Sequence, residues 1–136
     1  MAVVFSQSNS SPAIPWELLR YLSVGVANMG VGLSTIYLCM YVLHATDLGA
    51  NISGYGVGVI CSFVLNRRWT FASKGAWLPQ LARFLVVLGI AYAANIVTVL
   101  GLIHQLGTNR YLAQALGTIP YTAIGYVGSR LFAFRR

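Results

Sequence analysis

The stretch SFVLNRRWTF (residues 62–71) ends an apolar run with an asparagine, two adjacent arginines and a tryptophan. A core helix of a soluble protein has no need of such an ending. Arginine and tryptophan are common where a hydrophobic helix leaves a lipid bilayer, because both side chains suit the headgroup region. The stretch therefore predicts the end of a membrane-spanning helix.

The composition of the whole chain agrees with a membrane protein. Its 136 residues are 57% hydrophobic and only 8% charged, with nine Lys and Arg against two Asp and Glu. The cations stand at the edges of apolar segments and form no continuous stripe, which favours membrane topology and lipid phosphate over nucleic acid. We expect membrane lipids, and no nucleic acid, among the partners.

Four apolar segments are long enough to cross a bilayer, at about residues 18–43, 48–65, 81–106 and 112–132. None of them alternates apolar and polar residues as a membrane β-barrel strand does. The sequence therefore predicts an all-α membrane protein, a four-helix transmembrane domain over residues 16–136 with a flexible tail, residues 1–15, before it.

The positions of Lys and Arg predict the orientation of this domain. Eight of the nine flank the segment ends on one side, and only Arg110 lies in the loops of the opposite side. By the positive-inside rule, both termini are then cytoplasmic.

An internal repeat relates the two halves of the chain. A shift of 63 residues lays SFVLNRRWTF over GYVGSRLFAF (125–134), and the same shift lays RYL at Arg20 over RFL at Arg83. Two separate agreements on one offset predict two hairpin repeats of the same orientation, related by an axis along the membrane normal. The arginines of both repeats then gather on one membrane surface.

Small residues recur along the second segment at every fourth position. Such a stripe allows two helices to approach closely, and we expect it to be a packing interface, within the bundle or between subunits. It consists of Ala50, Gly54, Gly58 and Ser62, with Gly117 and Gly125 at the repeat positions.

Catalysis and metal binding find little support in the sequence. The only carboxylates, Glu17 and Asp47, are predicted on opposite membrane faces, so they cannot form an acid–base pair. The histidines and cysteines lack metal-ligand spacing. Because no carboxylate lies near a helix centre, a proton-coupled drug exporter is also disfavoured. We expect neither an enzyme nor a cofactor or metal.

Anion recognition at the cytoplasmic surface is the chemistry that remains, because guanidinium groups hold phosphate in a bidentate fashion. The candidate phosphate ligands are Arg20, Arg67, Arg68, Arg83 and Arg130, with Asn66 and Ser129 as neutral donors and Trp69, Phe71 and Phe132 as aromatic residues of the interface. The alternative for each is an ordinary topology or interface anchor.

Polar side chains within the spans have two interpretations. They form interhelical hydrogen bonds, or they line a path for a hydroxyl-rich cargo. The candidates are Asn28, Asn51, Asn95 and Gln114.

The motifs RYLSVG at residues 20–25, Ala50–Asn51 and above all SFVLNRRWTF resemble the GtrA-like family of small four-helix membrane proteins, over about residues 18–136. The resemblance implies a flippase that moves a polyprenyl-phosphate-linked monosaccharide, such as one on undecaprenyl phosphate, to the outer leaflet of the bacterial inner membrane. Such proteins serve cell-surface polysaccharide synthesis beside a membrane glycosyltransferase.

One departure from the family pattern concerns the second repeat. GSRLFAF carries Ser129 where the family often has an asparagine, which makes the second half the less certain contributor to binding. Four helices hardly enclose a path, so a homo-oligomer is expected. The alternative function is a non-transporting scaffold that anchors or activates a glycosyltransferase.

Overall fold

The structure is a computed structural model that describes residues 15–135. Its elements are α1 (Trp16–Tyr41), α2 (Asp47–Leu65), α3 (Trp77–His104) and α4 (Arg110–Gly128), with a π-helical turn after α2, η1 (Asn66–Thr70), and after α4, η2 (Ser129–Ala133). The predicted all-α fold with four helices is confirmed. The tail predicted over residues 1–15 lies outside the described residues, apart from Pro15.

Three of the helices are long and apolar enough to cross a membrane: α1, α2 together with η1, and α3. Helix α4 has the same length as α2, but its sequence is less apolar because it includes Gln114, Thr118 and Thr122. Four apolar spanning segments were predicted from the sequence, and the prediction is confirmed for three.

Local turn chemistry sets where α2 and α4 begin. Thr46 Oγ1 accepts a hydrogen bond from the Gly49 amide at 3.2 Å, and Asn109 Oδ1 accepts one from the Tyr111 amide at 2.8 Å. Both preceding turns contain a residue of positive φ, His44 at 49° and Gly107 at 61°. The two hairpin turns therefore share a side-chain cap and a residue of positive φ, each at positions 63 residues apart.

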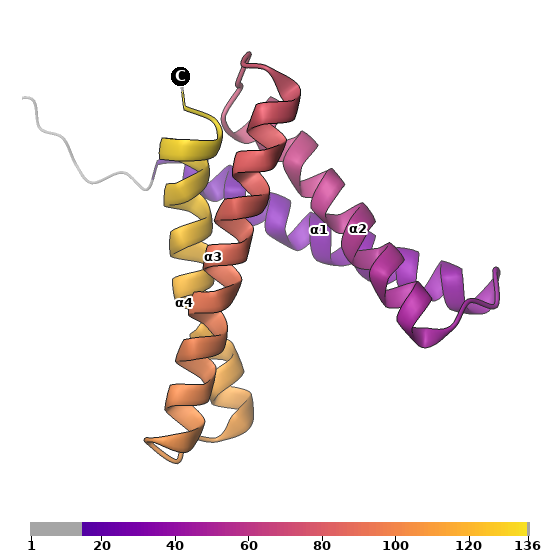
Figure 1. The fold of residues 1–136 in the computed structure, drawn as a ribbon, viewed down its shortest axis with the longest axis vertical. Coiled ribbons are helices and arrows are strands. Elements are labelled where there is room, and N and C mark those ends of the chain that lie inside the picture. Colours follow the sequence, from indigo (N-terminus) through magenta and orange to yellow (C-terminus); the bar gives the residue numbers. More distant parts are fainter. Residues whose placement is uncertain (1–14, 136) are drawn as a thin grey trace, which may run out of the picture.

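The helices pair as two hairpins, α1 with α2 and α3 with α4 (Figure 1). Close packing inside the first hairpin depends on Gly54, where a Cβ would come within 2.9 Å of the Gly32 carbonyl oxygen and overlap the Ile36 side chain. In the second hairpin, a Cβ on Gly117 would lie 2.5 Å from Val99 Cγ2. Glycine at these two positions permits the helices to touch.

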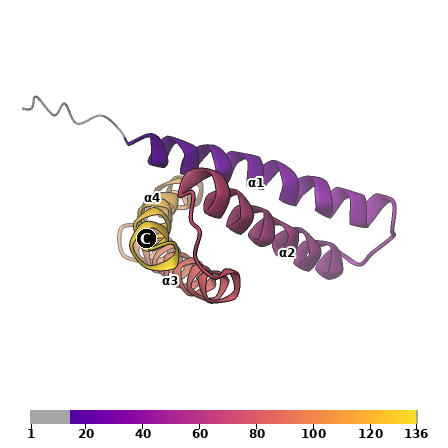
Figure 2. The ribbon, with the colours of Figure 1, turned by 90° about the horizontal axis from the view of Figure 1, so that it is seen from above.

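The two hairpins meet at one end and diverge towards their turns (Figures 1 and 2). The prediction of one four-helix bundle is wrong in this respect. The shared core lies at the junction and consists of Phe63, Phe71, Phe84, Val87, Tyr126, Ala133 and Phe134. Sequence cannot indicate this divergence, because residues that face lipid are as apolar as residues that face another hairpin.

The start of α1, the 71–76 loop and η2 lie at the junction end, whereas the turns at 42–46 and 105–109 lie at the far ends of the hairpins (Figure 1). These regions are the junction end and the two far ends of the molecule.

Candidate functional site

The junction end gathers the predicted arginines from four different elements. Arg20 lies near the start of α1, Arg83 near the start of α3, Arg67 and Arg68 in η1, and Arg130 in η2. The structure thus brings together cations that are distant in the sequence, but it gives them different partners.

Two of these arginines stack on aromatic rings. The guanidinium carbon of Arg20 lies 5.8 Å from the centroid of the Trp69 ring, and Arg20 Nη1 donates to the Trp69 carbonyl at 3.3 Å. The guanidinium carbon of Arg83 lies 5.7 Å from the Phe132 ring centroid. Both rings are 48% exposed, so each hairpin presents a cation–π pair at its surface.

Arg67 is engaged with the neighbouring hairpin. Its Nε donates to Gln80 Oε1 at 2.8 Å, and its Nη2 donates to the Gly75 carbonyl at 2.7 Å. Gln80 is buried at the start of α3 and also donates from Nε2 to Ser73 Oγ. Arg67 therefore fastens the 71–76 loop to α3.

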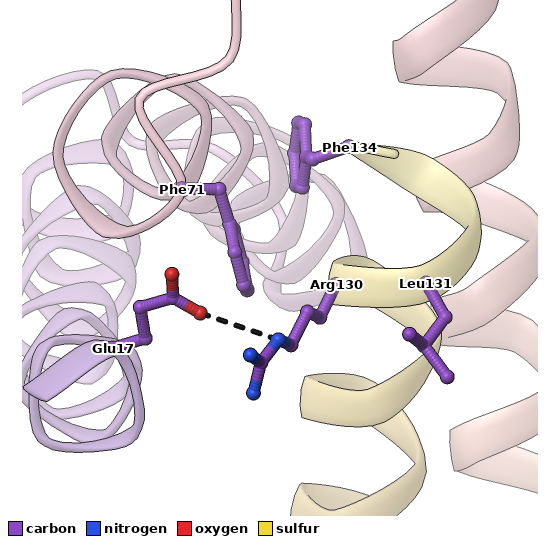
Figure 3. Close-up of a pocket in the computed structure, with 5 residues that line it drawn as sticks. All are labelled: Glu17, Phe71, Arg130, Leu131 and Phe134. Carbon is purple, nitrogen blue, oxygen red and sulfur yellow. Dashed lines mark ion pairs between the residues drawn. The ribbon is translucent and has the colours of Figure 1, made fainter. Parts of the chain in front are cut away.

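Arg130 faces a pocket of about 220 Å³ between α1 and η2, lined by Glu17, Phe71, Arg130, Leu131 and Phe134 (Figure 3). Its Nε lies 3.5 Å from Glu17 Oε2, and its Nη1 donates to the Tyr126 hydroxyl at 3.3 Å. Figure 3 shows the Glu17 and Arg130 side chains reaching towards one another from the two hairpins.

Arg67 and Arg130 each contact a residue of the other hairpin. Arg67 of η1 binds Gln80 of α3, and Arg130 of η2 pairs with Glu17 of α1. The same shift of 63 residues that takes Arg67 to Arg130 takes Glu17 to Gln80. Sequence reasoning missed Glu17 and Gln80 as the partners of these arginines, although this offset was the signal that could have found them.

Two predicted phosphate ligands and one predicted interface aromatic residue are buried. Asn66 is only 2% exposed, donates to Ser62 Oγ at 3.2 Å and accepts from Thr70 Oγ1 at 2.9 Å. Ser129 is buried, and Phe71 is 4% exposed in the junction core and not at the surface. These residues shape the π-helical turns, and their burial keeps them from a phosphate at the surface.

Arg68 differs from the other four predicted arginines. Its side chain is exposed, and within residues 15–135 it makes no hydrogen bond, ion pair or cation–π contact. It is therefore the predicted arginine that is most available to a ligand outside the protein.

A groove of about 600 Å³ follows the first hairpin from Ser62, one turn before η1, to Met40 near the far end. Asn28 and Asn51 line it, and Leu88 and Tyr121 from the second hairpin border it. Asn28 Oδ1 is buried without a hydrogen-bond partner among the described residues. The groove therefore offers polar groups in otherwise apolar surroundings.

The other two path candidates lie outside this groove. Asn95 packs at the α3–α4 contact, where its amide lies 2.8 Å from the position of a Cβ on Gly117, and Gln114 is exposed on α4. Of the small-residue stripe, Ala50 and Gly54 are buried in the first hairpin, and Gly58 lies beside Asn28. Gly125 instead leaves room for the Tyr21 hydroxyl of the other hairpin.

Apolar helices long enough to cross a bilayer, paired as hairpins with one cationic end, define a multi-pass helical membrane protein. The family described as GtrA/DPMS, transmembrane domain, matches residues 20–134. The chain belongs to this family, as the SFVLNRRWTF stretch predicted.

Several relatives carry names that describe a function. The chain is 36% identical over 121 residues to a bactoprenol-linked glucose translocase of Shigella phage SfII, covering 86% of this chain and 93% of the phage protein. It is 27% identical over 120 residues to the bactoprenol-linked glucose translocase of Salmonella phage P22, covering 85% and 92%. It is 25% identical over 132 residues to the cell wall teichoic acid glycosylation protein GtcA of Listeria monocytogenes, covering 90% and 91%.

Proposed function

We propose that the protein is a translocase that moves a polyprenyl-phosphate-linked monosaccharide across a bacterial inner membrane for cell-surface polysaccharide synthesis. The observation that carries this proposal is the cationic junction end with a polar groove beginning next to it. The names of the two phage relatives support a cargo of this kind.

The orientation and the repeat belong to the same proposal. Seven described cations lie at the junction end or in its loop and tail, so the positive-inside rule makes that end cytoplasmic. Elements that begin 63 residues apart, α2 and α4 as well as η1 and η2, support two hairpin repeats. Lipid-linked sugar made in the cytoplasm would then meet the arginines first.

The groove supplies what an unaided lipid-linked sugar lacks. Hydroxyl groups that enter hydrocarbon without hydrogen-bond partners cost several kcal/mol each, of the order of 2–7. Asn28 and Asn51 offer such partners along the first hairpin, while the prenyl chain stays in lipid beside the open groove. The phosphate is held by arginines at the junction end, with Arg130 as the principal contact.

This role requires no covalent chemistry by the protein. Glu17 is paired with Arg130 at the junction end, and Asp47 begins α2 at a far end, so the two carboxylates cannot act together. A concentration gradient of the lipid-linked sugar, or a coupling ion, would drive the transport.

We further propose two protein partners. A membrane glycosyltransferase that makes or uses the lipid-linked sugar follows from the proposed cargo. A second copy of the chain is favoured by the polar face of α4, where Gln114 and Thr118 are exposed one turn apart. Polar side chains on a membrane helix are better accommodated against protein than against lipid.

Reconstitution of the full chain into liposomes tests the translocase proposal. The measurement is the rate at which a prenyl phosphoglucose becomes accessible to a membrane-impermeant reagent on the opposite leaflet. We expect exchange by the wild type, and a loss of about tenfold or more in Arg130→Gln, the scale of one charge-assisted hydrogen bond. Arg110→Gln, which removes the cation that begins α4 at a far end, is the matched control and should leave the rate unchanged.

Two results would count against transport. Folded wild-type protein that exchanges none of several lipid-linked sugars supports the scaffold hypothesis, in which binding to a glycosyltransferase is the measurable activity. Equal loss in Arg130→Gln and Arg110→Gln shows an effect of net charge and removes the junction end as the site.

A further inference from the structure

We propose that the pocket around Arg130 is the phosphate site at the junction end, and that the Glu17 carboxylate competes with the phosphate for Arg130. The Glu17 carboxylate occupies Arg130 until the phosphate of the lipid displaces it. The identity of the ligand, a phosphodiester on a prenyl chain, rests on the proposed function. The competition itself rests on the difference between two contacts, that of Arg130 with Glu17 and that of Arg67 with Gln80.

The distances distinguish Arg130 from its counterpart Arg67. Arg67 makes hydrogen bonds of 2.8 Å to Gln80 and 2.7 Å to the Gly75 carbonyl, which are normal lengths for a guanidinium donor. The Arg130 Nε lies 3.5 Å from Glu17, beyond the 2.7–2.9 Å typical of a formed charge-assisted hydrogen bond. Arg67 is thus committed to the protein, whereas Arg130 is held loosely.

Exposure and shape agree with this difference. The Arg130 side chain is 51% exposed, so an outside anion can reach its guanidinium. The Glu17 side chain is 30% exposed, but its Oε2 is buried. Phe71, Leu131 and Phe134 give the pocket an apolar wall next to the charge (Figure 3). A phosphate that carries a hydrocarbon chain suits this combination better than a free, fully hydrated phosphate does.

The charges are matched for an exchange. A phosphodiester carries one negative charge, as the Glu17 carboxylate does, so either anion can neutralise the Arg130 guanidinium. The released carboxylate stays in the first turn of α1, where the helix dipole stabilises it. Arg130 therefore has an anionic partner both before and after the lipid binds.

Glu17 and Gln80 occupy equivalent positions of the two repeats, but only Glu17 carries the negative charge that competition with a phosphate requires. Gln80 stands where the second repeat would place the equivalent of Glu17, and a neutral amide gives Arg67 a permanent partner. Glu17→Gln would therefore make the Arg130 site resemble the Arg67 site while removing the competing charge.

Binding of farnesyl phosphoglucose to the purified full chain in detergent tests the inference without requiring transport. Glu17→Gln should lower the Kd about two- to fivefold, the range of a partly exposed ion pair. Asp47→Asn, which makes the same change of net charge at a far end, should not change it. Arg130→Gln should weaken binding more than any other variant, and Gln80→Glu should leave the Kd unchanged.

Other outcomes overturn the inference. An unchanged Kd in Glu17→Gln shows that Glu17 does not compete with the phosphate. Weaker binding in Gln80→Glu places the phosphate at Arg67. Displacement of the lipid by millimolar inorganic phosphate shows a site for the free anion. If Glu17→Gln tightens binding but no variant exchanges lipid in liposomes, the competition stands and the proposed transport fails.

Discussion

Phe71 and Phe134 stack on each other where the two hairpins meet, with ring centroids 5.3 Å apart and ring planes inclined by 20°. Each ring directly follows a π-helical turn, closed by hydrogen bonds from Phe71 N to the Asn66 carbonyl at 2.9 Å and from Phe134 N to the Ser129 carbonyl at 2.8 Å. The turns η1 and η2 thus deliver equivalent rings to one shared contact.

The ring contacts around this pair also occur twice. Phe63 lies 5.6 Å from Phe84, and their repeat counterparts Tyr126 and Tyr21 are also 5.6 Å apart, all measured between ring centroids. These matched contacts hold the hairpins together at the junction, and they support the proposal of two repeats.

Phe134→Ala should destabilise the protein strongly, because its side chain is buried among three other phenylalanines. Truncation of a buried phenylalanine costs about 3–5 kcal/mol. Leu131→Ala in the preceding π-helical turn, where the side chain is mostly exposed, is the matched control. Reversible unfolding in detergent micelles, followed by circular dichroism, compares the two. Equal losses of stability would show that the aromatic junction does not hold the hairpins.

Gly54→Ala should destabilise the first hairpin by about 1–3 kcal/mol, because the added Cβ forces α1 and α2 apart. Gly56→Ala is the control on the same helix, since nothing lies within 4 Å of a Cβ there. Alanine at that position should instead stabilise the helix by about 0.5–1 kcal/mol. The same unfolding measurement gives both values, and a neutral Gly54→Ala would contradict close packing of α1 on α2.

Asn66 and Asn51 should separate stability from transport. Asn66→Ala removes two hydrogen bonds within a buried turn and should lower the free energy of unfolding by about 1–3 kcal/mol. Asn51→Ala, on the exposed wall of the groove, should leave stability unchanged and reduce the leaflet-exchange rate. A reversed pattern would make Asn66 the cargo ligand and Asn51 a structural residue.

Much of the architecture could be predicted from local signals. The sequence contains signals for the helix ends, such as Pro15 before α1 and the apolar run that stops at Asn66. The 63-residue offset relates elements that have the same structure in both hairpins.

The arrangement of the hairpins and the state of each arginine could not be predicted in this way. Divergence depends on which apolar faces meet lipid, and composition does not distinguish these faces. Arg67 and Arg130 occupy the same place in the repeat, but their partners Gln80 and Glu17 lie in the opposite hairpin. Which residue each arginine contacts depends on how the two hairpins pack together. The two contacts then differ because Gln80 carries a neutral amide and Glu17 a charged carboxylate.

Arg67→Gln should loosen the 71–76 loop, because it removes the hydrogen bonds to Gly75 and Gln80 and leaves the buried Gln80 amide without this donor. Amide hydrogen exchange over residues 72–76 should accelerate about tenfold, the effect of losing one to two hydrogen bonds. Arg68→Gln, the adjacent exposed cation, is the control and should leave the loop protected. If Arg67→Gln keeps the loop protected but abolishes binding of farnesyl phosphoglucose, Arg67 contacts the lipid phosphate directly and the assignment of the phosphate site to Arg130 is wrong.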